Sequence, residues 1–321
     1  MTARVTCALT LALVAAMLLS LIAGKVWVPP AILGSDDPRA LIIMELRLPR
    51  TLLAALVGAA LGMSGAAMQG YLRNPLADPG LFGVSSGAAL GAVISLFFGY
   101  AAQAWLLPTF ALTGAAAAMA LLALLIGRSG SLIVFTLGGV ILSSIAGSMT
   151  ALAISLAPTP FATSQIVTWL MGALTDRSWD DVTIALPLIA IGIALLAATA
   201  RSLDVLTLGE PAARSMGVDP LRLQLLIIGG VGLCVGASVA AAGIIGFVGL
   251  IVPHLVRPFV GHRPSAVLLP SAIAGALLLV VADSVVRAAP TVSELRLGIA
   301  MSMLGGPFFL VLLLRMRRQL P

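Results

Sequence analysis

Long apolar stretches alternate with short polar connections along most of the chain. A transmembrane helix needs about 20 predominantly apolar residues. Segments near this length lie at residues 6–28, 50–70, 79–98, 108–127, 133–156, 182–200, 224–244, 246–261, 265–282 and 297–314. The eighth segment is the weakest, because it is short and contains His254 and Arg257. This pattern predicts an all-α, polytopic membrane protein with about ten spans that forms a single transmembrane domain over residues 1–321.

The composition excludes a soluble protein. Hydrophobic residues make up 60% of the 321 positions and charged residues only 9%, whereas a soluble domain has about 25% charged residues. The surroundings must therefore be mostly membrane lipid. The arginines are scattered singly between apolar stretches, so nothing in the net charge of +6 indicates nucleic-acid binding.

The distribution of charge orients the spans. With both termini in the cytoplasm, the inner connections hold 11 basic and four acidic residues, a charge of +7 against −1 outside. This asymmetry follows the positive-inside rule, and Arg315, Arg317 and Arg318 strengthen it at the last span. Glycines four residues apart, such as Gly58 and Gly62, predict close contacts between helices in a compact bundle.

Two connections are unusual. Between the second and third spans lie two prolines and two capping residues, with Asp78 expected as an N-cap and Pro79 in the first helical position. A tight turn is the simpler alternative for this motif, which comprises Asn74, Pro75, Asp78 and Pro79. The segment 201–222 is the longest polar stretch on the inner side. A short helix started by Pro211 and ended by Gly217 would suit a segment that docks on another protein. The alternative is a solvated loop.

The motifs of common enzymes are missing from the sequence. The only lysine, Lys25, is followed by Val26, so no Gly-Lys-Ser/Thr phosphate-binding loop exists. His254 and His262 lie eight residues apart without nearby cysteines and make a poor metal site, and no cofactor is indicated. Asp283 is expected near an outer helix end in contact with water. A stand-alone secondary transporter, the alternative class, would carry intramembrane carboxylates of the kind used in proton relays.

Several long motifs resemble the signature of the FecCD family. They are RLPRTL from Arg47, GMSGAAMQG from Gly62, NPLADPGLFGVSSGA from Asn74, LGEPAARSMGV from Leu208, GFVGLIVPHLVR from Gly246 and GGPFFL from Gly305. These ordered matches extend over essentially the whole chain. Members of this family are permease subunits of binding-protein-dependent ABC importers for iron–siderophores, haem and cobalamin.

The resemblance implies a fold like that of cobalamin-importer permeases. It also implies a homodimer in the bacterial inner membrane, two cytoplasmic ATPase subunits and a periplasmic binding protein. The chain itself would be no enzyme, because ATP hydrolysis would occur in the partner subunits. We expect it to move an iron chelate, an iron(III)-siderophore or haem, from periplasm to cytoplasm by alternating access, with cobalamin as the alternative cargo.

The resemblance also assigns roles to individual residues. The segment 201–222 would couple to the ATPase, with Glu210, Ala212, Ala213 and Gly217 at its best-defined positions. Acidic residues of the binding protein would dock on Arg47, Arg50 and Arg287; the alternative is that these arginines only extend toward the membrane interface. Arg296 stands where the family usually has proline.

His254 and Arg257 lie three residues apart on the eighth span and therefore on one helix face. The sequence leaves open whether they pair with other residues near the inner end or contact the cargo directly. Ligation of haem by His254 has no further support in the sequence.

Overall fold

The computed structural model describes residues 2–28, 37, 39–100, 103, 105–127, 132–290 and 294–317, where every regular element is a helix. Within these ranges, eight helices are long and apolar enough to cross a membrane. They are α1 (Thr2–Ile22), the run Ile42–Tyr71 that ends in α3 (Leu48–Tyr71), α5 (Leu106–Ile126), α6 (Leu132–Ser155), α8 (Trp179–Ala198), α11 (Pro220–Ala242), α13 (Pro264–Ala288) and α14 (Leu297–Arg317).

Two shorter apolar helices, α4 (Val84–Phe97) and α12 (Val248–Val260), occupy the third and eighth predicted segments. Each of the ten predicted segments therefore contains a helix, which confirms the all-helical polytopic fold. Arg318, part of the terminal basic cluster, lies outside the described residues.

The remaining helices are short and were not expected to span. They are α2 (Arg39–Leu41), a π-helical stretch (Ile42–Arg47), a 3-10 turn (Pro79–Phe82), α7 (Pro160–Leu170), α9 (Ala200–Leu206) and α10 (Glu210–Ser215). None of the ten predicted segments covers α7. Thr159 caps α7 through its side chain, which accepts a hydrogen bond from the Ala162 N–H, and Pro160 starts the helix.

The core of the bundle lies along α3 and α11. In the most apolar window of each of these helices 78% of the residues are buried, compared with 6% in α1 at the edge. Gly58 and Gly62 on α3 face Ser271 and Gly275 on α13 so closely that an added Cβ would overlap the opposing backbone. Small residues thus let these two helices pack backbone to backbone, as their spacing predicts.

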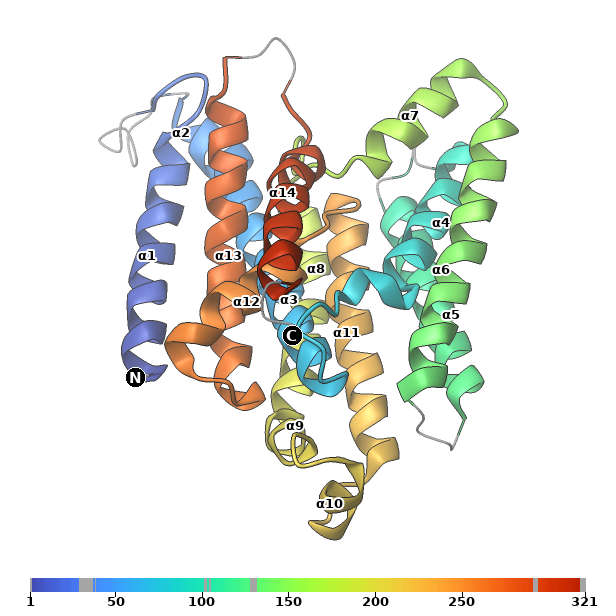
Figure 1. Cartoon of the computed structure of the whole chain (residues 1–321). Coiled ribbons are helices and arrows are strands. Elements are labelled where there is room, and N and C mark those ends of the chain that lie inside the picture. Colours follow the sequence, from blue (N-terminus) through green and yellow to red (C-terminus); the bar gives the residue numbers. More distant parts are fainter. Residues whose placement is uncertain are drawn as a thin grey trace.

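The two ends of the bundle differ (Figure 1). The N-terminal end of α1 lies at the same end as α9 and α10, which we call the inner end, whereas α7, the C-terminal end of α13 and the N-terminal end of α14 lie at the outer end. The first turn of α12 begins inside the bundle, where Gly249 packs against Gly65 and Leu61 of α3 and against Pro79. The third and eighth spans are therefore shorter helices joined to irregular backbone that is buried in protein.

Candidate functional site

Helices α9 and α10 project from the inner end of the bundle (Figure 1). α10 follows Gly209, whose φ of 99° suits glycine, and Pro211 stands in its first turn. Gly217, with a φ of 83°, follows the end of the helix. The structure therefore has the short helix predicted between Pro211 and Gly217.

The residues assigned to ATPase coupling differ in exposure. Ala213 is buried, with 2% of its surface exposed, while Ala212 and Glu210 are half-buried and Gly217 is exposed. Two large apolar side chains that sequence reasoning missed flank α10: Leu208 is 65% exposed and Met216 is 60% exposed. Both side chains lie on the part of the chain that projects from the bundle.

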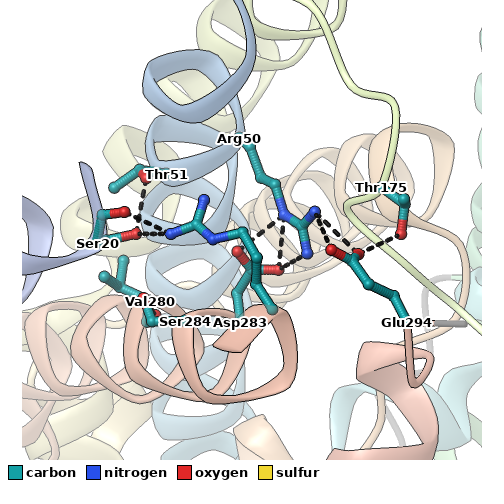
Figure 2. Close-up of polar contacts among 9 residues, drawn as sticks. Ser20, Arg50, Thr51, Thr175, Val280, Asp283, Ser284 and Glu294 are labelled. Carbon is teal, nitrogen blue, oxygen red and sulfur yellow. Dashed lines mark hydrogen bonds and ion pairs between the residues drawn. The ribbon is translucent and has the colours of Figure 1, made fainter. Parts of the chain in front are cut away.

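Arg50 lies at the centre of a polar network at the outer end (Figure 2). Its Nε donates to both carboxylate oxygens of Asp283 at 2.9 and 3.0 Å, and its Nη2 donates to Oδ1 at 2.8 Å. Its Nη1 lies 3.0 Å from Oε2 of Glu294, which also accepts a hydrogen bond of 3.3 Å from the Thr175 hydroxyl. The network joins α3, α13, Glu294 in the connection before α14, and the α7–α8 connection.

The expectation that Asp283 contacts water is wrong. Only 1% of its surface is exposed, because α3 covers this part of α13 and brings Arg50 against the carboxylate. Nothing in the local sequence could signal this contact, since the partners are 233 positions apart. Glu294 and Thr175 were likewise not anticipated as members of the network.

The other two arginines with a predicted docking role are also engaged within the chain. Arg47 Nη1 donates to the carbonyls of Leu21 and Ile22 at 2.9 Å and thereby satisfies the C-terminal end of α1. Arg287 Nη2 donates to the carbonyl and hydroxyl oxygens of Ser20 at 2.5 and 2.9 Å. Within the described residues, Nε and Nη1 of Arg287 have no hydrogen-bond partner.

All three arginines are buried, with exposed fractions of 6% for Arg47, 8% for Arg50 and 6% for Arg287. The structure thus brings them together at one end of the bundle, but inside a network made by the chain itself. Their docking role stays a prediction that the contacts of a single chain do not test.

The connection after α3 has Asp78 as an N-cap and Pro79 in the first turn, in the arrangement that the sequence predicts. The capped element is a 3-10 turn, and α4 begins only after Gly83, whose φ is 81°. The side chain of Asn74 accepts a hydrogen bond from the Leu76 N–H at 2.9 Å. Burial raises the pKa of the Asp78 carboxyl, and the hydrogen bond from the Gly80 N–H at 2.7 Å offsets part of that rise.

Arg257 holds α12 to α3 near the inner end. Its Nη2 donates to Gln69 Oε1 at 2.7 Å, and Gln69 Nε2 donates to the Gly249 carbonyl at 3.2 Å. His254 instead lies edge-on to Phe308 of α14, with ring centroids 5.9 Å apart. These contacts favour structural roles for both residues. In the described part of the chain, no group of three or more His, Cys, Asp and Glu side chains is placed to hold a metal ion.

Comparisons with known proteins agree with this arrangement. The profile of the FecCD transport family matches residues 12–315. The uncharacterized ABC transporter permease protein YvrB of Bacillus subtilis is 42% identical, covering 89% of this chain and 82% of its own. The cobalamin import system permease protein BtuC of Halobacterium salinarum is 41% identical, covering 88% of this chain and 76% of its own.

A third relative, the vitamin B12 import system permease protein BtuC of Klebsiella pneumoniae, is 38% identical over 96% of this chain and 93% of its own. Among solved structures, an ABC transporter described as of the metal-chelate type, in an inward-facing conformation, is similar with a TM-score of 0.89 and 32% identity. That similarity covers 97% of this chain and 99% of the other.

Proposed function

The chain belongs to the FecCD transport family as a multi-pass inner-membrane permease of an ABC importer, and we propose that it passes a metal chelate into the cytoplasm by alternating access. One observation carries the proposal most directly. The fold agrees, over 97% of the chain, with an inward-facing transporter described as of the metal-chelate type. The buried Arg50 network supports an inward-facing conformation, because it holds the helices together at the outer end.

Two separate ATPase subunits are proposed to bind the α9–α10 projection, with Leu208 and Met216 as apolar anchors beside Glu210, Ala212, Ala213 and Gly217. The chain cannot supply the hydrolysis through a phosphate-binding loop, because its single lysine is followed by valine.

A direct bond could transmit the movement of the ATPases from α9 to α13. The Asp204 carboxylate accepts hydrogen bonds from the N–H and the hydroxyl of Ser265, in the first turn of α13, at 2.8 and 2.6 Å. A carboxylate is favourable at a helix N-terminus, so this contact joins the projection to a central span.

A second copy of the chain is proposed to complete the pathway. In the most apolar windows of α6 and α14 only 17% and 28% of the residues are buried in the single chain. These apolar faces are therefore open to another copy as well as to lipid. The cargo path is proposed to run along the axis between the two copies, as the family resemblance implies.

A binding protein is proposed to dock at the outer end, where its acidic residues would meet Arg47, Arg50 and Arg287. Arg287 supports this idea best, because two of its guanidinium nitrogens lack a partner among the described residues. Docking on Arg50 would have to compete with Asp283 and Glu294. The alternative is that all three arginines only hold the outer end together.

The cargo is proposed to be a metal chelate, and the names of two relatives, both cobalamin or vitamin B12 permeases, support cobalamin. An iron(III)-siderophore or haem is the alternative that the family also allows. The test is competition among labelled cobalamin, an iron(III)-siderophore and haem for ATP-driven uptake by the reconstituted transporter. Uptake of one chelate supports the proposal and identifies the cargo; uptake of none contradicts it.

A further inference from the structure

A cavity of about 290 Å³ opens at the outer end and borders the Arg50 network at Thr175. It lies between the end of α4, helix α7, the α7–α8 connection and the residue before α14. Its polar lining consists largely of Ser164, Gln165, Thr168, Trp169, Arg177 and Arg296. The position places it on the side from which an importer receives its cargo.

The cavity is cationic. Arg177 and Arg296 both line it, and none of its lining residues in the described part of the chain is acidic. The neighbouring carboxylates are engaged elsewhere: Glu294 binds Arg50 and Thr175, and Asp181 caps α8 by accepting from the Ser178 N–H at 2.9 Å. Asp181 reaches Arg177 at 3.6 Å. Arg177 is therefore paired with Asp181, whereas the Arg296 guanidinium group has no acidic partner among the described residues.

Several donors around the cavity lack acceptors. The indole Nε1 of Trp169 and the Nε of Arg177 are buried atoms without a hydrogen-bond partner among the described residues. Within the same ranges, the Arg296 carbonyl accepts bonds from the Ile299 and Ala300 N–H groups, but its side chain makes no hydrogen bond or ion pair. Buried donors are almost always paired in folded proteins. Unpaired donors from two different elements at one cavity indicate a site for an acceptor that the chain does not itself supply.

We propose that this cavity binds an anionic group, a carboxylate or a phosphate, of the transported chelate. The inference rests on the proposed import of a metal chelate and adds which chemical feature of the cargo is recognised. Arginine suits the role because its planar fork binds carboxylate and phosphate through two parallel hydrogen bonds. The volume is below the roughly 300–1,000 Å³ of sites for drug-sized ligands, so the cavity fits one group of a large chelate rather than all of it.

Arg296 is one of the two cations that line the cavity. A proline there would leave Arg177 as the single cation of the cavity. The proposal therefore predicts that affinity for the anionic group depends on Arg296 and that lysine, which keeps the charge but not the planar fork, preserves only part of it.

The test uses the full-length chain purified in detergent, titrated with citrate or with inorganic phosphate while tryptophan fluorescence is recorded. We expect a saturable change that Trp169→Phe removes. Arg296→Gln should raise the Kd at least fivefold and Arg296→Lys by a smaller factor, whereas the inner-end control Arg4→Gln should stay within twofold of the wild type. Saturation by citrate identifies a carboxylate as the preferred group, and saturation by phosphate identifies a phosphate.

The proposal is overturned if neither anion gives a saturable change, or if Arg296→Gln binds as tightly as the wild type. Thermal unfolding is the folding control, and Arg296→Gln should unfold within a few degrees of the wild type because its side chain makes no bond to lose. Uptake assays distinguish failure of the proposed import function from failure of the proposed anion site. If the wild-type transporter imports no chelate, the proposed function fails, while the titration still decides whether the cavity binds anions.

Discussion

Arg50 and Asp283, 233 positions apart, form an ion pair in which two guanidinium nitrogens contact both carboxylate oxygens at 2.8–3.0 Å. Figure 2 shows this pair between α3 and α13, with Glu294 on the far side of the guanidinium group. Removing one member of a buried pair leaves an uncompensated charge and costs about 3–5 kcal/mol. The pair therefore dominates the polar energetics of the outer end.

The first prediction concerns this pair. Arg50→Met should strongly lower the thermal unfolding midpoint in detergent, because Asp283 then stays buried without a partner. The double variant Arg50→Met with Asp283→Leu should recover part of the loss, because the buried Asp283 charge is gone while Glu294 stays without Arg50. Arg177→Met, which breaks the more exposed Arg177–Asp181 pair, is the matched control and should cost about 1 kcal/mol or less. A single variant as stable as the wild type would contradict a structural role for the pair.

A second prediction tests the close packing of α3 on α13. A Cβ added at Gly58 would overlap the Gly275 carbonyl, so Gly58→Ala should destabilise the protein by about 1–3 kcal/mol. The control is Gly229→Ala on α11, where the added Cβ would meet only the Leu195 side chain at 3.5 Å, an ordinary contact. Because alanine is the better helix former, the control should be neutral or slightly stabilising. Equal unfolding midpoints for the two variants would disprove the close contact.

The third prediction concerns ATPase coupling. Ala212→Glu should leave the fold intact, because Ala212 is half-buried, and should reduce ATP-driven uptake at least tenfold by obstructing the docking surface. Ala213→Glu should instead lower the amount of folded protein, because Ala213 packs inward. Ala212→Ser is the control of similar size and should retain activity. Unchanged uptake by a folded Ala212→Glu transporter would refute the coupling role of α10.

Docking of the binding protein gives the fourth prediction. Arg287→Gln removes the charge and the bond from Nη2 to Ser20 but keeps a polar side chain, so thermal unfolding is measured first as the folding control. Capture of the binding protein should weaken several-fold at low salt, and the difference should shrink at high salt as charges are screened. Arg4→Gln, at the inner end, should capture it normally. If Arg287→Gln captures the binding protein as well as the wild type at every salt concentration, only the structural role remains.

The sequence predicts the spans well, because apolar length is a local property. The sequence predicts the existence and the boundaries of a helix less well where the helix is short or mixed in composition. α7 combines Thr163, Ser164 and Gln165 with apolar residues over 11 positions, so it has no transmembrane signal. α4 starts five residues later than its apolar segment, because Pro79–Phe82 forms a 3-10 turn and Gly83 interrupts the helix.

Site residues on a continuous segment could be predicted, whereas those that depend on distant contacts could not. The helix between Pro211 and Gly217 follows from local turn chemistry. The burial of Asp283 and the empty space beside Arg296 depend on helices far apart in the sequence. Such contacts set whether a charge is exposed, paired or free to bind, and no local pattern records them.

The most direct test of the central claim is uptake by proteoliposomes that contain this chain with its ATPase and binding protein. We predict that a radiolabelled metal chelate accumulates only when Mg-ATP and the binding protein are both present, and that the chain alone transports nothing. Robust uptake by the chain alone, driven only by a proton or sodium gradient, would contradict its role as the permease of an ATP-driven importer.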